Sequence, residues 1–285
     1  MAVDPYALTT LAKLQAYLGI PAATDEALLE DAIDAASTTI ENILGRKIVS
    51  REYWEWKDVQ GRTKDLSVSN PPITRIECVA VGSQTAITVN GAPGANDIGL
   101  SIHVQEDKVY LCRLDNGGTK HQTSLAFGSH KTLAAMATAI NATTGFTATS
   151  QFDGPVQLLH PTGGFNVFQT TAYLTAAWDV TLDTRIGYTG GMVSLISDSW
   201  PSDHWLRNFE EGRRNVLLHY VGGYETVPYD IEQVCLEAAA QMYRDRKRDR
   251  GVQSESLGDY SYSLGTATAT LDLVRSRLGS RTRIR

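Results

Sequence analysis

The six histidines are the first candidates for catalytic or metal-binding side chains, and their spacing favours neither role. No two of them form an HxH or HExxH pattern, which are spacings that direct two imidazoles to one metal ion. Histidines scattered along strands are usually ordinary surface or core residues. We therefore expect no metal site at these positions. The six are His103, His121, His130, His160, His204 and His219.

Motifs for nucleophilic catalysis and phosphate binding are also missing from the sequence. It contains no GxSxG, no GxxxxGK[ST] and no GxGxxG pattern after a strand, which are the signatures of a nucleophile elbow, a phosphate loop and a dinucleotide site. Asp179 and Asp183 are a conceivable carboxylate pair for acid–base chemistry. Their spacing on a strand or loop does not make them converge, so we expect both to be solvated. The sequence predicts a protein that is not an enzyme and needs no cofactor.

Two aromatic residues and three glycine pairs permit both a functional and a structural interpretation. Trp178 and Tyr188 could stack on sugars, but packing in a core is the more usual role of such side chains. The glycine pairs at 117–118, 163–164 and 190–191 lie between β-like segments, where turns are expected.

A cluster of basic residues follows the last strong helical pattern and continues into a basic tail. Residues 244–285 hold ten lysines and arginines against five aspartates and glutamates, whereas the preceding chain has sixteen against twenty-seven. An acidic body argues against sequence-specific DNA binding, because affinity depends on neutralising phosphates. The cluster is either a solvated helix end, whose cations suit the helix dipole, or a surface that faces a neighbouring subunit or DNA. It comprises Arg244, Arg246, Lys247, Arg248 and Arg250.

Length and composition indicate a globular protein. The 285 residues are 42% hydrophobic, enough for a real core in one elaborated domain or two modest ones. The three cysteines are far apart and form no CxxC pair, so we expect neither disulfides nor a thiolate metal site. We also expect no signal peptide and no membrane association, because no apolar run approaches spanning length.

Helical periodicity occurs near both ends of the chain. Residues 7–18 and 25–44 carry apolar residues at intervals of three and four, and Gly19 and Gly45 are expected to end these helices, with Thr24 as a cap of the second. A third helix is expected over residues 229–248 and a short one over 271–278.

β-favouring segments fill the space between these helices. The run from Lys47 to Gly61, short segments around 66–68 and 73–81, and residues 213–224 are expected to be strands. Residues 82–200 are rich in Thr, Gly, Ala and Asn and alternate in short segments, which predicts an inserted β-rich domain. Its one expected helix is 132–141, with Ser129 as a possible cap.

Two separated stretches resemble the phage head-to-tail connector (adaptor) family. The first stretch consists of the short helix LTTLAKLQAYLGIP and a long helix that ends in IENILGR, followed by an aromatic strand. The second stretch consists of GGYETVPYDIEQVCLEAAAQMYRDR and the later phrase SESLGDYSYSL. Together they cover residues 7–82 and 213–264. The sequence departs from the family in its insert of roughly 120 residues, since ordinary members have only a few strands there.

The resemblance implies an α+β fold with a helical bundle core of three to four helices and a small antiparallel β-element. Residues 1–81 and 201–285 would form this connector core, and residues 82–200 the inserted domain. It also implies a virion protein of the neck, assembled in the host cytoplasm, whose copies form a ring, usually a dodecamer. Such a ring would join the portal protein to a tail or stopper protein, with viral DNA passing through its channel without sequence-specific binding.

The resemblance also assigns docking onto the portal to the C-terminal stretch from about Ser254 to Arg285. We expect its polar phrase SESLGDYSYSL to be a loop, whose apolar anchors suit burial against a partner. The residues expected to dock are Leu257, Tyr260, Tyr262, Leu264, Arg281, Arg283 and Arg285. The alternative function is a surface- or carbohydrate-binding module of the virion, carried by the inserted β-domain.

Overall fold

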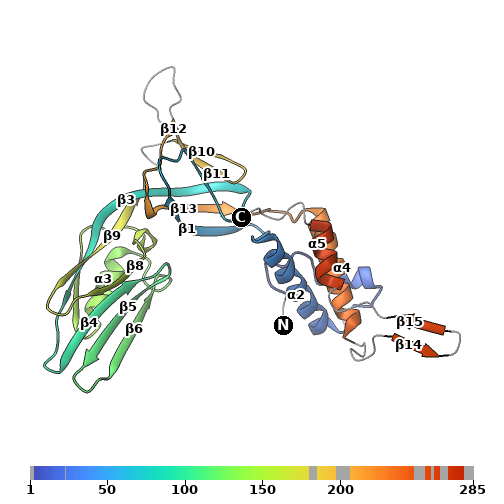
Figure 1. The fold of residues 1–285 in the computed structure, drawn as a ribbon, viewed down its shortest axis with the longest axis horizontal. Helices are drawn as coiled ribbons and strands as arrows, with labels where there is room; N and C mark the ends of the chain where they lie inside the picture. Colours follow the sequence, from blue (N-terminus) through green and yellow to red (C-terminus); the bar gives the residue numbers. More distant parts are fainter. Residues whose placement is uncertain are drawn as a thin grey trace. The chain divides into compact units, whose positions relative to one another are not determined.

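The computed structural model of the chain describes residues 3–22, 24–179, 185–196, 206–246, 254–257, 260–263 and 269–278. The chain divides into two compact units (Figure 1). The first, here called the helical unit, comprises Met1–Arg51, Ser69–Thr74 and Val221–Arg285. The second, the β unit, comprises Glu52–Val68 and Arg75–Tyr220. Both units are therefore built from segments that are distant in sequence.

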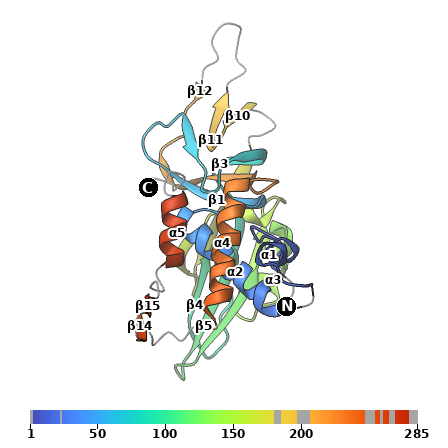
Figure 2. The same cartoon turned by 90° about the vertical axis from the view of Figure 1, so that its right-hand side faces the viewer.

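Four helices pack together in the helical unit. They are α1 (Leu11–Leu18), α2 (Glu26–Leu44), α4 (Tyr229–Asp245) and α5 (Ala269–Leu278). α2 and α4 lie side by side with α5 against them (Figure 2), and α1 contacts both α2 and α4. A hairpin of β14 (Ser254–Leu257) and β15 (Tyr260–Ser263) precedes α5.

The helical pattern in the sequence becomes the core of this unit. Leu29, Ile33, Ala36 and Ile40, which recur at intervals of three and four, are all buried on α2. They meet the buried face of α4 and two buried residues of α5. Burying such side chains stabilises a fold by about 1.5–3 kcal/mol each, so the apolar stripe is the main reason that these helices associate. The core residues on α4 and α5 are Ile231, Val234, Cys235, Leu236, Ala238, Ala239, Ala240, Val274 and Leu278.

The ends of the first two helices confirm the predicted stops and correct one predicted start. Gly19 and Gly45 both adopt the left-handed conformation, each with φ +67°, which a glycine reaches without a steric penalty. The N-terminal cap of α2 is Asp25 rather than Thr24, and its side chain makes no capping hydrogen bond. The Asp25 carboxylate instead bonds to residues of α4, and this tertiary contact outweighs local capping.

The β unit contains three sheets. The strand order of the first sheet is β1-β13-β3-β7, and β9 is also paired with β3. The strand order of the second sheet is β6-β5-β4-β8. The strand order of the third sheet is β10-β11-β12, and β2 is also paired with β11. The strands of the first sheet are β1 (Arg51–Val59), β3 (Ile73–Gly91), β7 (Phe146–Ser150), β9 (Thr171–Asp179) and β13 (Gly212–Gly222). Those of the second are β4 (Asp97–Val104), β5 (Lys108–Asp115), β6 (Lys120–Ala126) and β8 (Thr162–Asn166). Those of the third are β2 (Asp65–Ser67), β10 (Arg185–Thr189), β11 (Met192–Ile196) and β12 (Leu206–Arg207).

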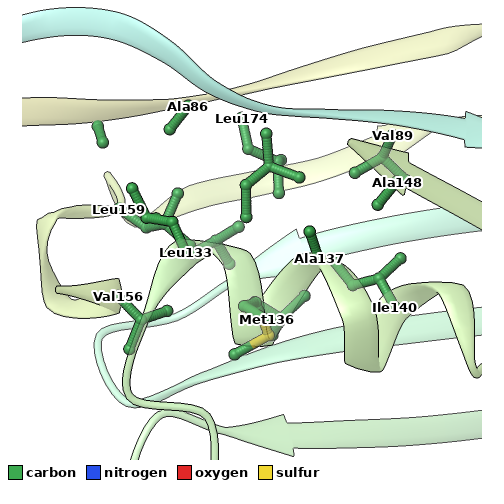
Figure 3. Close-up of a cluster of buried hydrophobic side chains, with 14 of the residues drawn as sticks. Ala86, Val89, Leu133, Met136, Ala137, Ile140, Ala148, Val156, Leu159 and Leu174 are labelled. Carbon is green, nitrogen blue, oxygen red and sulfur yellow. The ribbon is translucent and has the colours of Figure 1, made fainter. Parts of the chain in front are cut away.

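The helix α3 (Leu133–Asn141) provides much of the β unit's core. Leu133, Met136, Ala137 and Ile140 lie on one side of α3 and are all buried (Figure 3). They join apolar residues of β3, β9, β4 and β5 in one cluster, so the two larger sheets share a core with the helix. A 3₁₀ turn, η1 (Val156–Leu158), adds Val156 and Leu158 to it.

Several predicted details of the β unit are wrong. The cap of α3 is Thr132, whose hydroxyl accepts a hydrogen bond from the Ala135 N–H at 3.1 Å, whereas Ser129 lies three residues outside the helix. Gly163–Gly164 lies within β8 and not in a turn. The segments expected as separate short strands at 73–81 and 85–91 form the single long strand β3, which continues through irregularities in its pairing with β9.

The α+β class is confirmed, but its balance differs from the expectation. Strands contain more residues than helices in the described part of the chain, so a helical bundle is not the framework of the whole molecule. The extra strands come mainly from residues 82–200, where the sequence predicted short alternating segments. Among the residues that the structure describes, no helix is long and apolar enough to cross a membrane.

Candidate functional site

The predicted docking segment falls partly on a β-hairpin. Leu257 and Tyr260 are paired across β14 and β15, and Tyr262 is paired with Glu255. The sequence suggested a loop here, so the regular hairpin is a correction. The other four predicted docking residues lie outside the described residues; they are Leu264, Arg281, Arg283 and Arg285.

The basic cluster begins at the C-terminal end of α4. Arg244 occupies the last turn and is exposed, and Arg246 is the residue that caps the helix. Cations at this position interact favourably with the negative end of the helix dipole. Lys247, Arg248 and Arg250 lie outside the described residues, so their expected role facing DNA or a neighbour stays a prediction.

Arg246 belongs to a polar junction that joins the start of α2 to the end of α4. Its guanidinium forms an ion pair with the Asp25 carboxylate and lies 4.1 Å from the centre of the Tyr243 ring. The Tyr243 hydroxyl donates a hydrogen bond to Asp25 Oδ2 at 2.6 Å. That bond to a carboxylate raises the pKa of Tyr243, with a smaller contribution from desolvation. The junction holds two helix ends together.

A second polar junction joins α1 to the start of α4. Lys13 Nζ on α1 lies 2.5 Å from Glu232 Oε1 on α4. The carboxylate sits in the first turn of α4, where the helix dipole also favours negative charge. Lys13 is about half exposed, so this pair contributes little to stability, on the order of 0–1 kcal/mol. Its effect is to fix the position of α1 on α4.

Exposed apolar side chains on the helical unit are a feature that sequence reasoning did not single out. Tyr229 at the start of α4 is 78% exposed, Leu28 on α2 is 47% exposed and Tyr17 on α1 is 43% exposed. Large apolar groups in such positions frequently mark contact surfaces. The sequence does contain a signal for the exposure of Tyr229. The helical period that buries Ile231, Val234 and Ala238 places Tyr229 outside the apolar stripe.

No group of three His, Cys, Asp or Glu side chains among the described residues could hold a metal ion. No disulfide joins any of the three cysteines, all of which lie among the described residues. Burial raises the pKa of the Cys235 thiol to about 11, so this thiol is a poor nucleophile at neutral pH.

Comparisons with known proteins match the first part of the chain to one family. The model of the family described as HCP, head completion protein, matches residues 7–92. This segment contains α1 and α2 of the helical unit and continues through β1, β2 and β3. A search of curated proteins gives no significant match.

Two solved structures contain chains with a weaker likeness. One is from the neck of an empty GTA particle, at 11% sequence identity and a TM-score of 0.42. The other is from the virion of a native gene transfer agent particle, at 13% identity and a TM-score of 0.38. Each comparison covers 100% of this chain and 94% of the other chain. TM-scores this low do not establish a common fold.

The matched segment includes the first of the two stretches that suggested a connector protein, namely the short helix, the turn and the long helix ending in IENILGR. The chain is similar to head completion proteins over residues 7–92, which confirms the predicted resemblance to phage head-to-tail connector proteins in the first of its two stretches.

Proposed function

We propose that this protein is a structural adaptor that joins the portal vertex of a phage-like particle to its tail. The observation that carries the proposal is the match of residues 7–92 to head completion proteins. The helices α1 and α2 within that segment pack against α4 and α5 in one core. The C-terminal part of the chain would therefore act in the same unit as the matched segment.

The adaptor would work as a ring of identical copies, of which a dodecamer is the expected form. In a ring, one face of each subunit meets a different face of the next, and rotation closes the set. The exposed side chains of Tyr17, Leu28 and Tyr229 support this proposal, because contact with a second copy would remove apolar surface from water. The portal protein and a tail or stopper protein would contact the two ends of the ring.

Viral DNA would pass through the ring without sequence-specific contacts. The chain carries a formal net charge of −6, so most of its surface would repel the phosphates and not retain them. Arg246 is already paired with Asp25, which leaves the remaining residues of the basic cluster as the proposed DNA-facing or neighbour-facing groups. Residues 82–200 are proposed to be a domain inserted into this connector core.

Negative-stain electron microscopy of the purified protein, alone and mixed with its portal protein, tests the proposal. We expect ring-shaped particles, and we expect Tyr229→Glu to reduce their number because it introduces a charge at the most exposed apolar side chain of α4. Tyr173→Glu is the matched control, since Tyr173 is an exposed tyrosine of the β unit. A protein that stays monomeric at high concentration with and without the portal would refute the ring.

A further inference from the structure

The β unit contains a cavity that the adaptor function does not use. Its volume is about 820 Å³, which lies within the range of pockets that bind small molecules. Residues of β3, β9 and β13 line it, together with residues 160–162 and 208–211. Two large aromatic residues are among them, and of these Phe209 is buried whereas Trp178 on β9 is partly exposed.

An irregularity in β3 places Trp178 in the cavity wall. Val81 pairs with Trp178 and Gln84 with Ala176, so two residues of β3 lie opposite one residue of β9. This is a β-bulge, a device that redirects side chains. Gly82 in the bulge has φ +75°, and a methyl group at this residue would overlap the Trp178 ring. The indole therefore packs directly on the Gly82 backbone, and its side chain remains 44% exposed.

Trp178 and Tyr188 differ from the expectation of core packing. Tyr188 is 45% exposed, much like Trp178, so neither ring is part of the core. The two also differ from each other, because Trp178 lines the cavity and Tyr188 is not among the described residues that do so. The sugar-stacking interpretation therefore applies to Trp178 and not to the pair.

His160 holds the opposite parts of the wall together. Its Nε2 lies 2.9 Å from the carbonyl oxygen of Gly82, and its Nδ1 lies 3.0 Å from the carbonyl oxygen of Arg214. A protonated imidazole donates to both carbonyls, whereas a neutral ring donates to one. Arg214 has the unusual φ of +47°, and its N–H donates to Asp58 Oδ1 at 2.7 Å. Strained backbone of this kind is frequent at functional sites.

The wall offers both donors and acceptors of hydrogen bonds. Asn215 donates from Nδ2 to the Glu210 carbonyl at 2.6 Å, while its Oδ1 is buried with no partner among the described residues. Thr162 Oγ1 is likewise buried and has no hydrogen-bond partner among the described residues. Both atoms are shielded from solvent, so a ligand hydroxyl would bond to them only after a local rearrangement that exposes them. Two carboxylates and two guanidiniums also line the cavity, those of Glu210, Glu211, Arg213 and Arg214.

We propose that this cavity binds a neutral saccharide, with Trp178 as the stacking surface for one sugar ring. A sugar presents an apolar face that suits an aromatic ring and a rim of hydroxyls that both donate and accept. The equal numbers of carboxylates and guanidiniums favour an uncharged ligand over an anion or a cation. A peptide from another subunit is the competing occupant, but an extended peptide is usually recognised by pairing with an open strand edge. The exposed indole of Trp178 instead offers a flat apolar face.

The test uses the full-length protein and three neutral oligosaccharides as probes: cellotetraose, chitotetraose and maltotetraose. Saturation-transfer NMR and calorimetry are expected to show saturable binding of at least one of them at concentrations up to about 10 mM. Trp178→Ala should weaken that binding at least about tenfold, which corresponds to about 1.4 kcal/mol. Trp178→Phe keeps an aromatic surface and should retain part of the affinity.

The matched control is Tyr173→Ala, which removes another exposed aromatic side chain from the same strand and should bind like the wild type. Circular dichroism checks that each variant is folded. Failure of the wild type to bind any of the three probes would overturn the proposal, and so would a folded Trp178→Ala variant with unchanged affinity. Ring formation is measured separately, so failure of this proposal leaves the adaptor function standing, and the reverse also holds.

Discussion

A buried hydroxyl connects three segments of the helical unit and can be removed with little change in volume. Ser37 Oγ on α2 accepts a hydrogen bond from the Leu8 N–H at 3.1 Å and lies 3.6 Å from Cys235 Sγ on α4. All three residues are buried. The substitution Ser37→Ala leaves the Leu8 N–H buried without this acceptor.

The magnitude follows from two opposing contributions. A buried donor that loses its acceptor costs about 1–3 kcal/mol. Alanine has a higher helix propensity than serine, which returns about 0.5 kcal/mol in the middle of α2. We therefore expect Ser37→Ala to lower the free energy of unfolding of the helical unit by about 0.5–2.5 kcal/mol.

The assay is urea denaturation followed by circular dichroism at 222 nm, a signal to which the helices contribute strongly. The control is Thr38→Ala at the next position of α2, which is exposed and should change stability by less than about 0.5 kcal/mol. If Ser37→Ala is as stable as the control, the Leu8 N–H finds another partner and our account of this junction is wrong.

Three further predictions concern single residues. Hydrogen bonds from the Gly94 N–H and Arg113 hold the pKa of Asp97 below 3.8. The Asp97 carboxylate therefore stabilises the fold above pH 3.8, and this stabilisation is lost as the pH falls through the lowered pKa. In thermal denaturation, Asp97→Asn should be less stable than the wild type at pH 7, and the difference should be smaller below pH 3.8. With a thiol pKa of about 11, Cys235 should resist a disulfide reagent in the native protein at pH 7 and react only after unfolding, as followed by absorbance. A methyl group at residue 91 would overlap a main-chain carbonyl, so Gly91→Ala should lower the melting temperature, whereas Gly163→Ala in open space should not.

The helices were largely predictable because their cores depend on local periodicity. The apolar intervals of residues 25–44 matched the buried face of α2, and the two glycines marked the ends of α1 and α2. The starts were less predictable, because a cap competes with tertiary contacts. The Asp25 carboxylate accepts hydrogen bonds from Arg246 and Tyr243, which are distant in sequence, and does not cap its own helix. A short window of sequence around Asp25 does not contain these partners.

For the β unit, the sequence predicted that the segments are strands but did not predict which strands pair. Alternation identifies strands but does not say which strands pair, so the pairing of β2 with β11 and of β3 with β9 had no local signal. The cavity at Trp178 depends on this long-range pairing and on a bulge within it. Its lining residues come from positions 81 to 216 of the chain, which explains why no local sequence motif predicted it.

The structure also changes how the predicted docking segment should be tested. Removing residues 254–285 would delete α5, whose Val274 and Leu278 are buried in the core of the helical unit. Losing their burial would cost about 3–6 kcal/mol, a large part of the stability of an ordinary domain, so lost docking in that variant would reflect unfolding. Replacing only residues 254–263 with a glycine–serine linker of equal length removes the β14–β15 hairpin and keeps α5. We expect this variant to retain its far-ultraviolet circular dichroism spectrum and to lose co-sedimentation with the portal; intact co-sedimentation would show that the hairpin is not the docking element.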